Sequence, residues 1–390
     1  MNPVNKAIVD RLVGQTESEN LVLSLFAPMH RAGREVQQNE IVWKNVLTEA
    51  RKKLAESGAD EEEADKLLSA ASRKLEDETF WQHQSDGLAY FSDGDSSEFL
   101  KLDHEVESIT HVSNEYLIGP VASSLADLTE SFILACSPKR VRLLKVTGNS
   151  VADLDPEELP ENLVEALNID EYVSALQHRS TANSSTGSQK ATTFHGHGGS
   201  DPDVKKQDEI LQYFHVLDRA LDSAIGSHTK NGDACLIFAG VDYLFPIFKE
   251  ASSYPNLCDE AISGNPDDLK PAELLEKAQP IIRAMADEKV IQQLSEFSDK
   301  NHSDWASLDE SEVSKAAVLG QIKTLFVSDE ASRIEYSKCI SLTIQYGGKI
   351  VLVEQSQLED MNLDFDIAAI FRTPAGSFLD AVEAVEDSIC

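Results

Sequence analysis

The chain has 390 residues, a formal net charge of −34 and a hydrophobic content of 41%. This length suggests two or three domains, and the apolar content is enough for buried cores, which excludes wholesale disorder. A strongly acidic chain disfavours general adhesion to nucleic acid, so a nucleic-acid partner requires local basic patches. Because no long apolar run occurs, we expect no membrane span and a cytoplasmic protein. Five cysteines without C-x-x-C spacing argue against a zinc ribbon and a disulfide framework.

The first 125 residues have mainly helical patterns. Apolar residues recur near helical spacing over 41–54, and a second helix is expected over 61–75 with Asp60 as its N-cap. Short apolar runs farther along predict strands, the last of them at Tyr116–Ile118. Together these patterns predict an N-terminal α+β domain over residues 1–127.

The pattern changes at Ser131, and we expect a middle domain over 128–285. Its expected elements are, in order, strands over 132–136 and 141–146, a glycine-rich polar loop over 178–204, an amphipathic helix from Asp203 and a buried strand over 234–239. A long helix is expected to start near Pro271, because proline suits the first turn of a helix.

The last third alternates helices and strands, which predicts a C-terminal α/β domain over 286–390. Its expected elements are strands over 324–327, 350–353 and 367–371 and helices over 312–322 and 332–346. The whole chain is therefore expected to be a multidomain α/β protein.

The polar loop ends in the run Phe194-His195-Gly196-His197-Gly198-Gly199-Ser200. Glycines allow a close backbone approach to a partner, and histidines titrate near neutral pH. His-x-His supplies only two metal ligands and spacing fixes no third, so we predict neither metal nor cofactor. A metal-dependent hydrolase stays open as an alternative, since Asp201 and Asp203 are nearby. Walker, dinucleotide and G-x-S-x-G motifs do not occur here.

The order of strands, polar loop, His-Gly-x-Gly-Gly tip, long helix and strand ending at Ala239-Gly240 resembles the middle domain of archaeo-eukaryotic class-1 translation release factors. In that family the loop bears a Gly-Gly-Gln tripeptide, and Gly198-Gly199-Ser200 stands at the matching place here. The C-terminal alternation is similar to the family's third domain, which shares the fold of kink-turn-binding ribosomal proteins. Residues 30–39 and 86–89 resemble phrases of a bacterial branch of this release factor and Pelota superfamily.

The resemblance implies an RNase H-like middle domain and a ribosome-associated translation factor. The implied activity is codon-independent rescue by peptidyl-tRNA hydrolysis, because the first domain has no codon-reading motif. The implied partners are the ribosome, rRNA and the tRNA acceptor end, with a translational GTPase as a candidate. The alternative is a non-catalytic ribosome-binding rescue or hibernation factor.

Two sets of candidate residues follow. The candidate catalytic residues are His195, His197, Gly198, Gly199 and Ser200. The candidate RNA-binding residues, taken from two basic patches, are Arg31, Arg34, Lys44, Lys190, Lys205 and Lys206. Ser200 would retain the backbone N–H of the family's glutamine but not its amide side chain.

Overall fold

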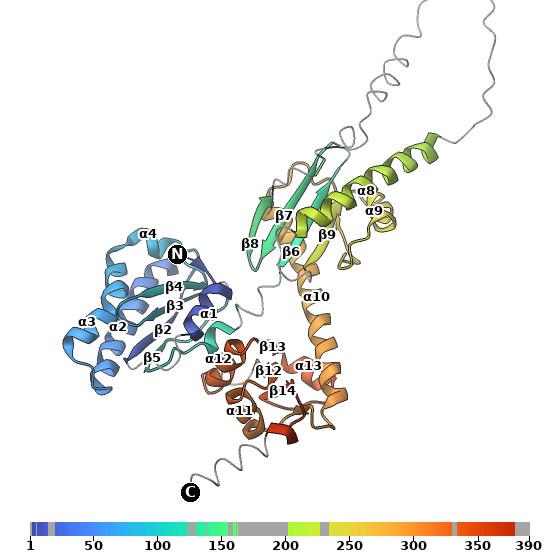
Figure 1. Ribbon diagram of the computed structural model, residues 1–390. Helices are drawn as coiled ribbons and strands as arrows, with labels where there is room; N and C mark the ends of the chain where they lie inside the picture. The colour runs from blue at the N-terminus through green and yellow to red at the C-terminus, as the bar shows by residue number, and fades with distance from the viewer. Residues whose placement is uncertain are drawn as a thin grey trace, which may run out of the picture. The chain divides into compact units, whose positions relative to one another are not determined.

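The computed structural model has a mixed α/β fold, with three sheets among the residues that it describes, and divides into two compact units (Figure 1). The described residues are 2–4, 6–14, 20–122, 124, 130–137, 139–154, 159–160, 162, 202–226, 234–329 and 334–378. The first unit combines Met1–Leu128 with Asp287–Cys390, and the second is Thr129–Ala286. The division into three domains stays a prediction, because the N-terminal and C-terminal segments have separate sheets but share one unit.

The N-terminal part of the first unit has a five-stranded sheet in the order β1-β4-β3-β2-β5. Its strands are β1 (Asn2–Pro3), β2 (Val22–Pro28), β3 (Gly87–Ser92), β4 (Ser97–Leu102) and β5 (Ile109–Ser113). Its helices are α1 (Lys6–Gly14), α2 (Gln38–Glu56), α3 (Glu61–Arg73) and α4 (Glu78–Gln82). Buried side chains of α1 pack on one face of the sheet, and those of α2, α3 and α4 pack on the other. Helices and strands are thus combined in this segment, as the predicted α+β pattern requires.

The predicted helix over 61–75 is confirmed as α3. It begins after Asp60, whose carboxylate accepts a hydrogen bond from the N–H of Glu63 at 2.9 Å, as an N-cap should. Three glutamates in its first turn complement the positive end of the helix dipole.

The predicted strand at Tyr116–Ile118 is wrong. The N–H of Leu117 donates to Ser24 Oγ at 3.0 Å, and the next two N–H groups donate to Ser337 Oγ at 3.0 and 2.9 Å. Serine hydroxyls thus satisfy amides that a neighbouring strand would otherwise satisfy, and the chain continues into the short 3-10 helix Gly119–Val121.

The C-terminal part of the first unit has a four-stranded sheet in the order β11-β14-β12-β13. Its strands are β11 (Ala306–Ser307), β12 (Ile322–Ser328), β13 (Lys349–Val353) and β14 (Ile367–Phe371). Its helices are α11 (Glu310–Val318), α12 (Ser337–Gln345), α13 (Gln355–Asp360) and the end of α10 (Pro271–Lys300). The strands predicted over 324–327, 350–353 and 367–371 are confirmed. Helix α11 ends earlier than predicted, because Gly320 adopts a φ of 67° and β12 begins two residues later.

The second unit has a five-stranded sheet in the order β10-β9-β6-β7-β8. Its elements are β6 (Glu130–Cys136), β7 (Val141–Thr147), β8 (Ser150–Leu154), α8 (Pro202–Gly226), β9 (Cys235–Gly240), α9 (Leu244–Ala251) and β10 (Ile262–Ser263). Strand β6 is parallel to β9 and antiparallel to β7. Helices α8 and α9 cover one face, and the start of α10 packs on the other (Figure 1).

The strands and helices predicted for this unit are confirmed, whereas the predicted loop over 178–204 lies outside the described residues as far as 201 and α8 begins at Pro202. Both strands before the loop, the helix after it and the buried strand that follows are present, and α10 begins at Pro271. Within the described residues, no helix combines the length and the apolar character that crossing a bilayer requires.

Substitution of Ser337 tests whether its hydroxyl stabilises the N-terminal and C-terminal segments of the first unit together. Ser337→Ala leaves two buried N–H groups without an acceptor, so we expect the free energy of unfolding to fall by about 2 kcal/mol in urea titrations. The control is Ser311→Ala, on the exposed surface of α11, which should change it by less than about 0.5 kcal/mol. Equal stability of the two variants would contradict this role for Ser337.

Candidate functional site

The structure describes the two elements that flank the candidate loop, called its frame below, and does not describe the tip of the loop. The candidate residues His195, His197, Gly198, Gly199, Ser200 and Lys190 lie outside the described residues. Lys205 and Lys206 belong to α8, but their side chains are also outside the described part. What the structure does describe is the strand before the loop, β8, and the helix after it, α8.

Both ends of this frame lie at one edge of the middle sheet. Because β6 and β8 are each antiparallel to β7, they run in the same direction, and Leu134 and Leu154 both pair with Leu143. Strand β9 is also parallel to β6, so the edge collects the carboxyl ends of β6, β8 and β9. In open α/β sheets, ligands bind outside the carboxyl ends of the strands.

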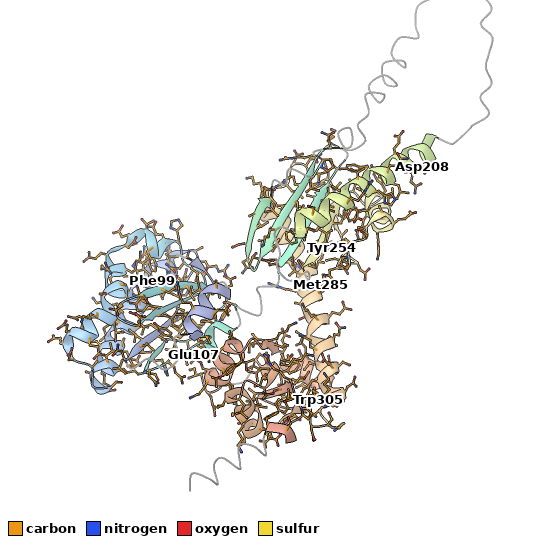
Figure 2. All side chains as sticks on the ribbon, viewed as in Figure 1. Phe99, Glu107, Asp208, Tyr254, Met285 and Trp305 are labelled. Carbon is orange, nitrogen blue, oxygen red and sulfur yellow. The ribbon has the colours of Figure 1, made fainter. Side chains whose placement is uncertain are left out.

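Helix α8 starts beyond this edge before it packs on the sheet. Its first described residue with a buried side chain is Ile210, and at the usual helical rise the helix runs about 12 Å from Pro202 to Ile210. Figure 2 shows Asp208 near the free end of α8 and Tyr254, which donates to the carbonyl of Ala234 before β9, toward the other end of the unit. Among the residues of α8 with described side chains, packing on the core thus begins at Ile210.

The buried groups at this edge are poor nucleophiles. Cys136, the last residue of β6, lies with its Sγ 3.4 Å from the hydroxyl of Tyr213 on α8. Burial raises the pKa of the Cys136 thiol to about 12, and burial likewise raises the pKa of the Tyr213 hydroxyl. Both groups stay protonated at neutral pH, so they serve packing rather than covalent chemistry.

The exposed groups at this edge were missed by the sequence reasoning. Lys139 and Arg140 lie on the turn between β6 and β7, and Tyr243 follows β9 with 51% of its surface exposed. A basic turn at the carboxyl edge suits a ligand that carries phosphate groups.

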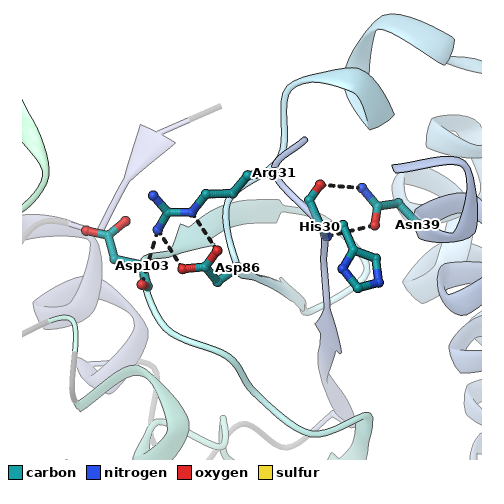
Figure 3. Close-up of polar contacts among 5 residues, drawn as sticks. All are labelled: His30, Arg31, Asn39, Asp86 and Asp103. Carbon is teal, nitrogen blue, oxygen red and sulfur yellow. Dashed lines mark hydrogen bonds and ion pairs between the residues drawn. The ribbon is translucent and has the colours of Figure 1, made fainter. Parts of the chain in front are cut away.

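The N-terminal candidate residues lie in a loop that is held at its base by Asn39 (Figure 3). The Asn39 side chain, fully buried, accepts from the N–H of His30 at 2.9 Å and donates to the His30 carbonyl at 3.0 Å. It also donates to the carbonyl of Trp81 at 3.3 Å. One amide thus fixes the start of the loop to α2 and α4.

Arg31 connects this loop to the strand that begins at Gly87. Its Nε and Nη2 donate to the two carboxylate oxygens of Asp86 at 2.5 and 2.7 Å, and Nη2 also donates to the Asp103 carbonyl (Figure 3). This fork geometry is the one that arginine makes best with carboxylates. Arg31 therefore positions the loop, whereas Arg34 and Lys44 are exposed on η1 (Arg34–Gln37) and α2.

The candidate RNA-binding residues are thus distributed over several elements. The structure brings Arg31 and Arg34 together in one loop, while Lys44 lies on the following helix. Within the described part of the chain, no group of three or more His, Cys, Asp or Glu side chains is placed to hold a metal ion.

Residues 132–284 match the model of the Bacterial archaeo-eukaryotic release factor family 7. The predicted resemblance to this superfamily is confirmed. The matched segment runs from β6 into α10, and it includes the whole connection between β8 and α8. No match was found among the curated proteins.

The chain is also similar to solved structures at low identity. S. cerevisiae Dom34, a translation termination-like factor that interacts with Hbs1, is 13% identical over 96% of this chain and 93% of that chain, with a TM-score of 0.38. Archaeoglobus fulgidus Pelota is 12% identical over 96% of this chain and 94% of that chain, with a TM-score of 0.33. Archaeal termination factor aRF1 is 13% identical over 95% and 99%, with a TM-score of 0.23. Similarity at this level carries no argument about activity.

The Asn39 amide tests how the N-terminal loop is held. Asn39→Ala removes the partner of the buried Trp81 carbonyl and of the part-buried N–H and carbonyl of His30, so we expect a loss of about 2 kcal/mol in unfolding free energy. Hydrogen exchange at the His30 amide should also become faster. The control is Asn45→Ala on the exposed face of the same helix, and identical exchange in the two variants would contradict the assignment.

Proposed function

We propose that the chain is a ribosome-associated translation factor that rescues ribosomes without reading a codon, by hydrolysing peptidyl-tRNA. The observation that carries this proposal is the family match over residues 132–284, which spans the loop with its His-Gly-His-Gly-Gly tip. The frame adds support, because β8 and α8 hold the two ends of the loop at the carboxyl edge of the sheet.

The roles of the tip residues follow from their chemistry. Gly198 and Gly199 allow the backbone to approach the ester closely, and the N–H of Ser200 would donate to the developing oxyanion. His195 or His197 would supply general acid–base help, which is typically worth about 10² to 10⁴ in rate. Ser200 lacks the longer amide of the family's glutamine, so a histidine is needed to position or activate the attacking water.

The proposal extends to the folds and partners of the two remaining parts. The strand order β10-β9-β6-β7-β8, with β7 antiparallel to its neighbours, supports an RNase H-like middle domain. The helix–strand alternation of the last third supports a domain like the kink-turn-binding ribosomal proteins. The proposed partners are the ribosome, rRNA, the tRNA acceptor end and a translational GTPase.

The proposed RNA contacts combine both basic patches. They comprise Arg31, Arg34, Lys44, Lys190, Lys205 and Lys206. Arg31 keeps a place in this set because its Nη1 group donates to no described residue. Such contacts require an interaction that weakens steeply as salt rises.

A second candidate function is a non-catalytic ribosome-binding factor for rescue or hibernation. Serine at position 200 favours it, because the tip then lacks the side chain that the family's chemistry uses. The two candidates differ in peptide release and agree in ribosome binding.

Peptide release from stalled ribosomes separates the two candidates. We expect purified protein to release a labelled peptide, and His197→Ala or Gly199→Ala to slow release at least about 100-fold without unfolding the protein. Thr192→Ala, outside the tip, is the matched control and should release peptide at the wild-type rate. Ribosome binding without release by the wild-type protein would establish the non-catalytic candidate instead.

A further inference from the structure

An open groove between α2 and α3 is lined by both cations and apolar side chains. Its volume is about 550 Å³. Its polar lining residues are Lys44, Thr48, Arg51, Lys52 and Ser72, and its apolar ones are Leu47, Ala55, Leu68 and Leu75. Among the described residues, no carboxylate lines this groove. In a chain with a net charge of −34, three cations around one groove are a local exception.

The adjoining face of α3 has the reverse character. A second hollow there is lined by Glu61, Glu62 and Asp65, with Lys66 as its one cation among the described residues. The two hollows thus differ in charge, and the ion pair between Arg51 and Asp65 joins a residue of each. The acidic hollow supplies a control position, because it is lined by α3 and the turn at Gly94 rather than by α2.

The cations of the groove are available to an outside partner. Lys44 makes no ion pair with any described residue, and Lys52 lies 3.6 Å from Glu56 in an exposed pair. Arg51 contacts Asp65 at 2.6 Å, but both side chains are more than half exposed. Exposed pairs of this kind are weak and screened by salt, so a phosphate can replace either carboxylate.

The spacing of these side chains suits a polymer rather than a single ion. Lys44, Thr48, Arg51 and Lys52 fall on one stripe of α2, because residues three and four apart share a helix face. From Lys44 to Lys52 the helix rises about 12 Å. A duplex carries a phosphate charge every ~1.7 Å of its axis, so several phosphates fit along this length. The stripe can therefore contact several phosphates at once.

Thr48 adds a feature that distinguishes RNA from DNA. Its hydroxyl donates to the carbonyl of Lys44 at 2.8 Å, which leaves Oγ1 as an acceptor facing the groove. The 2′-hydroxyl of RNA can donate to such an acceptor, and DNA has no equivalent group. Ser72, across the groove, has a hydroxyl that can donate to a phosphate oxygen.

We propose that the α2–α3 groove binds the phosphate backbone of RNA, with Lys44, Arg51 and Lys52 as the cations and Thr48 as the acceptor for a ribose 2′-hydroxyl. The inference deepens the proposed function, since it assigns Thr48, Arg51, Lys52 and Ser72 to the surface that meets RNA. It commits to RNA because the three cations follow one stripe of α2 that rises about 12 Å, a length that spans several phosphates, and competition by polyglutamate tests an acidic protein as the alternative.

The test measures binding of a fluorescein-labelled RNA duplex, and of its DNA counterpart, by fluorescence anisotropy over a range of salt concentrations. We expect the variant Lys44→Ala, Arg51→Ala, Lys52→Ala to bind the RNA at least about 10-fold more weakly. The slope of log K against log salt should fall by about 0.9 for each phosphate contact that is lost. Lys44→Ala alone should show part of the same effect, which guards against misfolding of the triple variant.

The controls separate the groove from general electrostatics. Lys66→Ala, in the acidic hollow, removes one positive charge from the same helical pair and should leave RNA binding unchanged. Thr48→Val should reduce the preference for RNA over DNA while it leaves the salt slope unchanged. Equal affinity of wild-type protein and the triple variant would overturn the proposal, and so would polyglutamate that competes as well as RNA does.

This assay fails independently of the proposed function. Binding of free RNA requires neither a ribosome nor hydrolysis. A protein that releases no peptide can therefore still bind RNA through the groove, and the anisotropy assay decides whether it does. Conversely, a triple variant that binds RNA normally would remove the groove while leaving the release assay intact.

Discussion

The fold of the second unit depends on the parallel pairing of β6 with β9. Parallel strands cannot be joined by a tight turn and need a long crossover connection. Here that connection contains β7, β8 and α8, and the polar segment with the tip lies inside it. Helices α8 and α9 close the core on one face of the sheet, and Leu159, at the start of the connection from β8 to α8, packs against the same core.

Charge is the second constraint on any account of this chain. A net charge of −34 opposes contact with RNA unless cations gather locally. Helix α2 shows such gathering, because Lys44, Arg51 and Lys52 line one groove. Arg31 has a structural role instead, because its bidentate contact with Asp86 holds a loop in place. Counting basic residues in the sequence does not separate these two uses.

Strong periodic patterns were predictable from the sequence, and contacts between distant residues were not. The apolar face of α8 and the apolar run of β9 could be read directly, because Leu217, Leu221 and Ile225 fall at helical spacing. Strand β2 was overlooked, since both of its faces are buried and its run shows no polar alternation. The contact between Arg31 and Asp86 joins segments far apart in sequence, so no local pattern reveals it.

The most direct test of the central claim is pelleting of the protein with ribosomes, for the wild-type chain and for a variant lacking residues 192–201. The account predicts that wild-type protein pellets with ribosomes at low salt and is released as salt rises, because phosphate contacts carry the interaction. It also predicts that the variant, which keeps its basic groove, pellets but releases no peptide. Wild-type protein that stays in the supernatant at low salt would contradict the assignment to translation.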